Sequence, residues 1–114
     1  MDVTFDQSTE GYAIISLNGR LDIPAVDSVE DRFLAKTQAV ESHVVLNMSD
    51  VNYIGSSGIR LILTGAKTLS KRGFQLVVIN VQSFVEDAML SAGVQTVLPI
   101  FDTEVGGFDY LNQL

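Results

Sequence analysis

The sequence predicts an α/β fold built on a mixed β-sheet with parallel crossovers. Three observations lead to this prediction. Short apolar strand-like runs alternate with longer segments of helical periodicity. The first two strand-like runs are joined by a tight turn, which predicts an antiparallel hairpin. The chain has 114 residues, which is the length of one ordinary domain covering residues 1–114. Hydrophobic residues make up 46% of it, which is enough for a core.

The N-terminal third predicts a hairpin followed by a helix. Val3–Gln7 and Tyr12–Leu17 are the two strands, and the turn between them is Ser8–Gly11. Asn18-Gly19 is expected to end the second strand. Pro24 suits the first position of a helix because its missing N–H has no partner there, and an apolar face predicts a helix from about Pro24 to about Val40.

The middle of the chain predicts a strand, a break and a second helix. The strand is His43–Met48, followed by a link at Ser49–Asn52 and an extended Tyr53-Ile54. Gly55-Ser56-Ser57-Gly58 interrupts the pattern. Helical periodicity returns from Ile59 to about Arg72 with Ile59, Ile62, Ala66 and Leu69 facing inward, and Gly73 ends the helix.

The last third predicts one central strand and two more helices. Phe74–Asn80 is almost wholly apolar, which is typical of a central strand covered on both faces. The remaining predictions are a helix from about Ser83 to Ser91, a short strand at Val97–Phe101 and a helix at Thr103–Leu114. Gly106-Gly107 weakens the last helix by roughly 1 kcal/mol per glycine relative to alanine. The phenylalanines of this region are expected in the core (Phe74, Phe84, Phe101, Phe108).

Composition excludes several classes of site. With no cysteine there is no disulfide or thiolate chemistry, and with only His43 there is no multi-histidine metal site. His43 itself is expected at a strand edge without a partner or a role. The sequence contains no identifiable pair of acid and base residues and no phosphate-binding loop. It therefore predicts no catalytic residue, no cofactor and no metal.

Charge and hydropathy limit the partners and the cellular location that the sequence predicts. The net charge of −7 argues against general binding to nucleic acid. The longest uncharged stretch, Ala88–Phe101, is shorter than the ~20 apolar residues of a membrane span. The expectation is a cytoplasmic protein, a monomer, without membrane insertion.

The segment Gly55–Gly58 lies between a strand and a helix, where unpaired N–H groups and the helix dipole favour negative charge. The commoner interpretation is that one serine caps the helix. The sharper interpretation is a serine whose phosphorylation adds about two negative charges to an exposed surface. A nucleophile elbow is excluded, because Gly-Ser-Ser-Gly lacks its central serine.

Basic residues gather beside the serines. No acidic residue occurs from Val51 to Val85, whereas Arg60, Lys67, Lys71 and Arg72 all fall in this segment. A solvated helix face that complements the helix dipole is the commoner explanation. The alternative is a basic surface that meets an acidic partner.

Two motifs resemble the signature of STAS domains, the family of anti-sigma factor antagonists. One is the segment Val44–Ile59, with the sequence VVLNMSDVNYIGSSGI, and the other is Leu17–Asp22, with the sequence LNGRLD. The resemblance spans nearly the whole chain. It implies a STAS-like domain with a four- to five-stranded mixed sheet and helices mainly on one face.

The resemblance also implies a non-catalytic function. Such antagonists bind an anti-sigma factor that is also a serine kinase, are released when that kinase phosphorylates them, and are reset by a phosphatase. The acceptor matches Ser56, with Ser57 as its neighbour and Asp22 as a nearby turn residue, although Asp22 is first of all a candidate turn or cap residue. Gly55 stands where the family has aspartate. The expected partner-binding residues are Asp22, Gly55, Ser56, Ser57, Gly58, Ile59 and Arg60.

Two other functions follow from the same resemblance. Gly55 weakens the switch signature, which favours a structural STAS subunit of a larger assembly, such as a lipid-transport ABC system or a stress-signalling scaffold. Some relatives bind nucleotides, so weak nucleotide binding at the helix that follows Gly55 is a third hypothesis.

Overall fold

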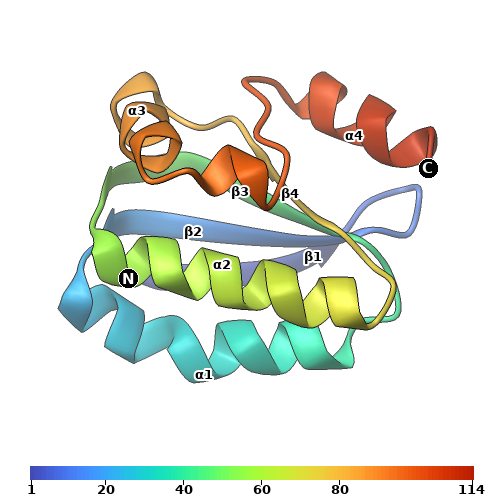
Figure 1. Ribbon diagram of the computed structural model, residues 1–114. Helices are drawn as coiled ribbons and strands as arrows, with labels where there is room; N and C mark the ends of the chain where they lie inside the picture. The colour runs from blue at the N-terminus through green and yellow to red at the C-terminus, as the bar shows by residue number, and fades with distance from the viewer.

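The computed structural model describes residues 1–114, and a four-stranded sheet runs through it (Figure 1). Strands β1 (Asp2–Gln7) and β2 (Ala13–Leu21) form the expected antiparallel hairpin. Strand β3 (Val44–Ile54) pairs in parallel with β2, and β4 (Leu76–Ile79) pairs in parallel with β3. The predicted mixed sheet is confirmed, in the order β1-β2-β3-β4.

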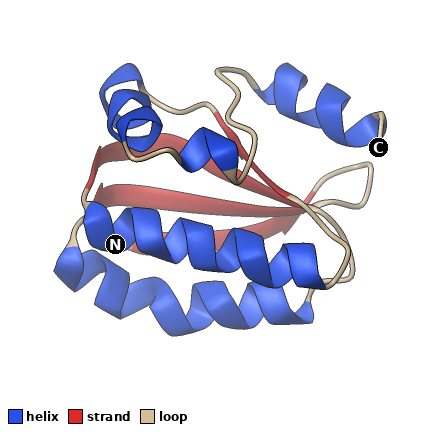
Figure 2. Cartoon of the chain, in the orientation of Figure 1, coloured by secondary structure: helices blue, strands red, loops and turns tan.

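Four α-helices cover the sheet unequally (Figure 2). Helices α1 (Ile23–Ala39) and α2 (Ser56–Lys71) lie side by side on one face. Helix α3 (Ser83–Ser91) and the 3₁₀ turn η1 (Val94–Thr96) contribute to the same core, whereas α4 (Glu104–Asn112) packs on the opposite face. The expectation of helices mainly on one face is confirmed. No helix combines the length and apolar composition that crossing a bilayer requires.

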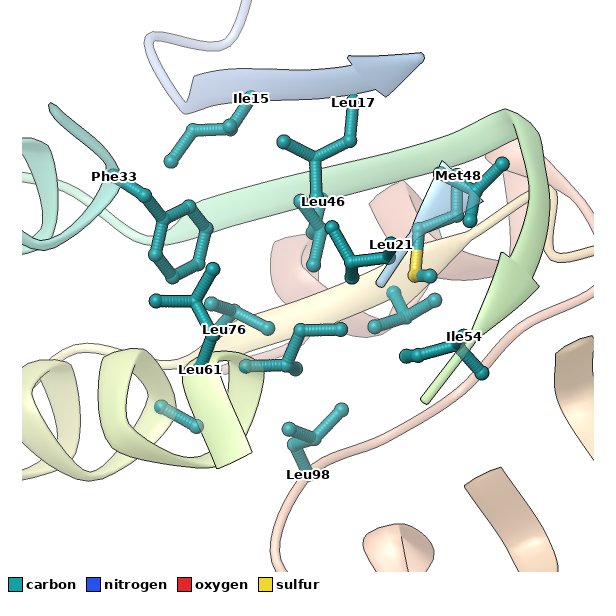
Figure 3. Packing of buried hydrophobic residues seen from close by; sticks show 14 of the residues in the cluster. Ile15, Leu17, Leu21, Phe33, Leu46, Met48, Ile54, Leu61, Leu76 and Leu98 are labelled. Carbon is teal, nitrogen blue, oxygen red and sulfur yellow. The ribbon is translucent and has the colours of Figure 1, made fainter. Parts of the chain in front are cut away.

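The main core lies between the sheet and helices α1 to α3 (Figure 3). It is one cluster of 23 buried residues, in which Phe33 of α1 is completely buried. Gly65 of α2 faces this ring, and a Cβ atom there would lie 2.7 Å from Phe33 Cε1. The absence of a side chain at Gly65 therefore lets α1 and α2 approach closely.

Strands β2 and β3 are longer than the sequence predicts. Asn18-Gly19 does not end β2, because the pairing with β3 continues to Leu21 through two register shifts. Gly19 has φ +115°, which glycine adopts readily, so the strand bends without ending. The predicted link Ser49–Asn52 is also wrong, since β3 continues through it to Ile54.

Strand β4 is buried as predicted but is not central. All four of its residues are buried, yet β4 is the edge strand of the sheet. Beyond it lies a single bridge between Val78 and Ile100 in place of the strand predicted at Val97–Phe101. This one bridge protects the edge, and α4 covers the second face over Ile79.

Helix α3 has the predicted bounds, but the placement of Phe84 in the core is wrong. Its side chain is 69% exposed at the start of α3. The core positions of α3 are instead Val85 and Met89. Phe74, Phe101 and Phe108 are half-buried against the two clusters.

Candidate functional site

Two loops meet at the carboxyl ends of the parallel strands β2 and β3. The backbone N–H of Gly55, after β3, donates to the carbonyl oxygen of Leu21, at the end of β2, at 3.1 Å. Helices α1 and α2 both start at this end of the sheet (Figure 1). The topology therefore brings Asp22 and the segment Gly55–Arg60 to one end of the molecule, as the sequence predicts.

Asp22 caps helix α1. Its Oδ1 accepts a hydrogen bond from the backbone N–H of Ala25 at 3.1 Å, and its Oδ2 lies 3.6 Å from Nε of Arg20. The Arg20 guanidinium in turn stacks over the Tyr53 ring, 4.2 Å from its centroid. The cap interpretation of Asp22 is confirmed, and this contact chain ties the first loop to the strand that leads into the second.

Neither serine caps helix α2. The N-cap is Gly55, with extended backbone angles of φ −102° and ψ −179°, and no side chain accepts a cap hydrogen bond. The helix begins at Ser56, three residues before the predicted Ile59, so that Ser56, Ser57 and Gly58 form its first turn. The commoner interpretation, in which one of these serines serves as the cap, is therefore wrong.

Ser56 and Ser57 differ in access. Ser56 is exposed on the first turn of α2. Ser57 turns inward, and its Oγ is fully buried without a hydrogen-bond partner. An enzyme that modifies a hydroxyl group at this end of the molecule meets Ser56 at the surface, whereas the hydroxyl of Ser57 faces inward.

The two glycines of this segment have different structural requirements. A Cβ atom at Gly58 would lie 2.8 Å from both Cγ and Cδ2 of Leu21 and 3.0 Å from the Leu21 carbonyl oxygen. At Gly55 the nearest atom would be the Tyr53 hydroxyl oxygen, at an ordinary 3.5 Å. Packing therefore requires glycine at position 58 but not at position 55.

A shallow groove between the N-terminal turns of α1 and α2 borders Ser56. Ile23 stands at its α1 side with a 67% exposed side chain, and Arg60 stands exposed at its α2 side. Ile59 is half-buried against the core. Sequence reasoning missed Ile23, although its position between the cap Asp22 and Pro24, outside the apolar face of the helix, was a usable signal.

The structure does not bring His43 to this site. It precedes β3, whereas Gly55 follows the other end of that strand. The expectation that His43 lacks a partner is wrong, because its Nδ1 accepts from the backbone N–H of Gln75 at 3.0 Å. A serine–histidine pair is absent, and His43 joins the starts of two neighbouring strands.

The family model of the STAS domain matches residues 5–106. An anti-sigma F factor antagonist of Paenibacillus polymyxa is 29% identical over 104 residues, which are 89% of this chain and 87% of the relative. A protein of Bordetella bronchiseptica described as an anti-sigma factor antagonist, BtrV, is 27% identical over 100 residues, 88% of this chain and 85% of the relative.

Solved structures show the same fold. An anti-sigma-factor antagonist (STAS) domain protein of Planctomyces limnophilus superposes with a TM-score of 0.85 over 98% of this chain and 99% of its own, at 18% identity. The Bacillus cell fate determinant SpoIIAA in its phosphorylated form superposes with a TM-score of 0.70 over 96% of this chain and 98% of its own, at 19% identity. The predicted fold class is confirmed.

Proposed function

Because this chain belongs to the STAS domain family, we propose that it is an anti-sigma factor antagonist whose binding is switched by phosphorylation of Ser56. The observation that carries the proposal is the position of Ser56. Its hydroxyl is exposed on the first turn of α2, free of any capping role, next to a serine whose oxygen is buried. The names of the two sequence relatives support the same function.

The protein acts as a binding module and the chemistry belongs to its partner. The anti-sigma factor, as a serine kinase, transfers the γ-phosphoryl group of ATP to Oγ of Ser56. The O–P bond forms as the bond to ADP breaks, and the hydroxyl proton passes to the kinase or to solvent. A phosphatase restores the hydroxyl by hydrolysis. No residue of this chain is catalytic.

Phosphorylation at Ser56 changes the charge of a docking surface without disturbing the core. The phosphate brings about −1.5 to −2 charges to a helix N-terminus, where the helix dipole stabilises it. The partner surface in contact with Ser56 must then desolvate this charge, which opposes binding. The expected contact residues are those that the two loops bring together: Asp22, Gly55, Ser56, Ser57, Ile59 and Arg60. Gly58, which the sequence also predicted as a contact, is buried and supports this surface from beneath.

The departure at Gly55 alters the starting charge of the switch. The first turn of α2 contains no acidic residue, and its N-cap has no carboxylate. In the unphosphorylated protein this turn is therefore free of negative charge. The phosphate then introduces the first negative charge on the turn.

The test is capture from host lysate with the wild type and the variants Ser56→Ala, Ser56→Asp and Ser57→Ala. We expect an anti-sigma kinase with the wild type, Ser56→Ala and the matched control Ser57→Ala. The aspartate variant should bind the purified kinase at least about fivefold more weakly, since one like or desolvated charge costs 1 kcal/mol or more. With ATP, mass spectrometry should find phosphate on Ser56 and none on Ser57.

Two results contradict the proposal. Equal binding of wild type and Ser56→Asp shows that charge at this position does not control the interaction. Retention of the same transporter ATPase by all four proteins favours the structural STAS subunit, the alternative that Gly55 suggests.

A further inference from the structure

The exposed face of α2 carries three unpaired cations in one row. Arg60, Lys67 and Lys71 are all exposed, and positions i, i+7 and i+11 return to the same side of a helix. The ion pairs of the molecule are Arg20–Asp22 and Arg72–Glu41, so none of the three takes part in one. We call these three residues the cationic stripe.

The cationic stripe is an exception in an acidic protein. The net charge is −7, yet the sequence contains no acidic residue from Val51 to Val85. Asp27 and Glu30 on α1 line the groove together with Arg60, and neither forms an ion pair with it. Lys67 and Lys71 lie further along α2, beyond this groove.

Apolar side chains border the stripe. Ile59 and Leu63 are half-buried on one side of it, so part of each remains in contact with solvent. Ile23, 67% exposed, lies at its N-terminal end. From Ser56 to Lys71 this surface extends about 22 Å along the helix at 1.5 Å per residue. A partial apolar border beside fixed charge is the composition of a protein docking surface.

We propose that the stripe docks an acidic, partly apolar face of the anti-sigma factor, so that the interface runs along α2 from Ser56 to Lys71. The identity of the partner rests on the proposed function, whereas its chemistry follows from charge complementarity. The partner presents carboxylates opposite Lys67 and Lys71 and apolar side chains opposite Ile59 and Leu63.

This placement assigns a mechanism to the switch. Ser56 precedes Arg60 by one turn, on the same side of the helix. A phosphate of about −1.5 to −2 charges there exceeds the single positive charge of Arg60 at the N-terminal end of the stripe. The phosphorylated protein then presents a negative N-terminal end to an acidic partner, so that this end repels the partner and the total attraction falls.

The test compares Lys67→Glu with the matched control Arg32→Glu, which changes the net charge equally. Arg32 is exposed on α1 and does not line the groove beside Ser56. We expect Lys67→Glu to weaken binding of the purified anti-sigma factor at least about fivefold and to reduce its salt dependence. Arg32→Glu should change affinity less than twofold, as measured by calorimetry at two salt concentrations.

A second measurement works without the natural partner. The ¹⁵N-labelled protein is titrated with a synthetic amphipathic helical peptide of glutamate and leucine, and with the same peptide carrying lysine for glutamate. Amide shifts confined to α2, seen with the acidic peptide alone, support the proposal. Shifts centred on another element overturn it.

The outcomes separate this inference from the proposed function. If Ser56→Asp releases the anti-sigma factor while Lys67→Glu binds like the wild type, the stripe is not the docking surface and the switch stands. If Lys67→Glu weakens binding while Ser56→Asp does not, the stripe stands and the switch fails. Binding to phosphatidylglycerol vesicles or duplex DNA that Lys67→Glu abolishes assigns the stripe to a different polyanion and overturns the proposal.

Discussion

At the scale of the residue, the two glycines that flank the serine pair differ in whether they have room for a Cβ atom. Gly58 packs against Leu21, and a Cβ atom would come within 2.8 Å of its side chain. Gly55 has room for a side chain, and its φ of −102° suits any residue. Packing therefore requires glycine at position 58, whereas a side chain at position 55 would be compatible with the fold.

We predict that Gly58→Ala lowers the free energy of unfolding by about 1–3 kcal/mol, the usual cost of overpacking a core. Gly55→Asp should leave it unchanged or raise it by a few tenths of a kcal/mol, because aspartate is a good N-cap. Urea denaturation measures both. Equal losses in the two variants would show that the Leu21 contact does not distinguish these positions.

At the scale of the element, α4 depends on a glycine that helix propensity disfavours. A Cβ atom at Gly107 would overlap Cγ2 of Ile79, so only glycine allows α4 to lie this close to β4. A Cβ at Gly106 would meet Thr103 Oγ1 at 3.2 Å and Phe101 Cδ1 at 3.3 Å. Both contacts are tight, but neither is an overlap. Gly106-Gly107, which weakens the prediction of the last helix, is thus explained mainly by the close packing at Gly107.

The prediction is that Gly107→Ala destabilises the protein by about 1–3 kcal/mol despite the gain of roughly 1 kcal/mol in helix propensity. Gly106→Ala receives the same gain with a smaller steric cost, so its melting temperature should be clearly higher than that of Gly107→Ala. Thermal melts followed by far-UV circular dichroism compare the two. The opposite order would place the close contact at Gly106.

At the scale of the whole molecule, packing brings acidic residues from separate segments together. Glu86 on α3 lies near Asp102, which comes just before α4. Desolvation, with further contributions from the carboxyls of Asp102 and Asp87, raises the pKa of Glu86 above its usual value. The folded protein therefore binds this proton more tightly than the unfolded chain does.

The sign of the pH dependence follows. Between the unfolded and the folded pKa of Glu86, stability falls as pH rises, and above both values the ionised carboxylate destabilises the fold. We expect Glu86→Gln to raise the free energy of unfolding modestly at pH 7 and to leave it unchanged near pH 3. Urea titrations at both values check this, with Glu104→Gln as an exposed control. A gain at pH 3 equal to that at pH 7 would contradict the assignment.

Much of the fold and part of the site followed from local patterns. The hairpin turn, the proline in the first turn of α1 and the glycines after α2 and α3 mark where elements begin and end, because caps and turns act over a few residues. The end of α3 was predictable from Gly93 for this reason. The serine pair, placed between a strand and a helix by glycines, was a candidate modification site from its neighbours alone, and the resemblance to STAS domains singled out Ser56.

Only the tertiary structure decided which hydroxyl is reachable and which strand is an edge. Periodicity does not distinguish Ser56 from Ser57, since their difference arises from the packing of α2 against the sheet. It misplaced β4 at the centre and Phe84 in the core, because burial depends on which distant segments cover a residue. The sequence by itself determined the order of strands and helices and the motif that joins this chain to its family. Long-range contacts decided the sheet order and which serine is exposed, because these depend on partners far away in the chain, whereas the row of cations on α2 follows from local helical spacing.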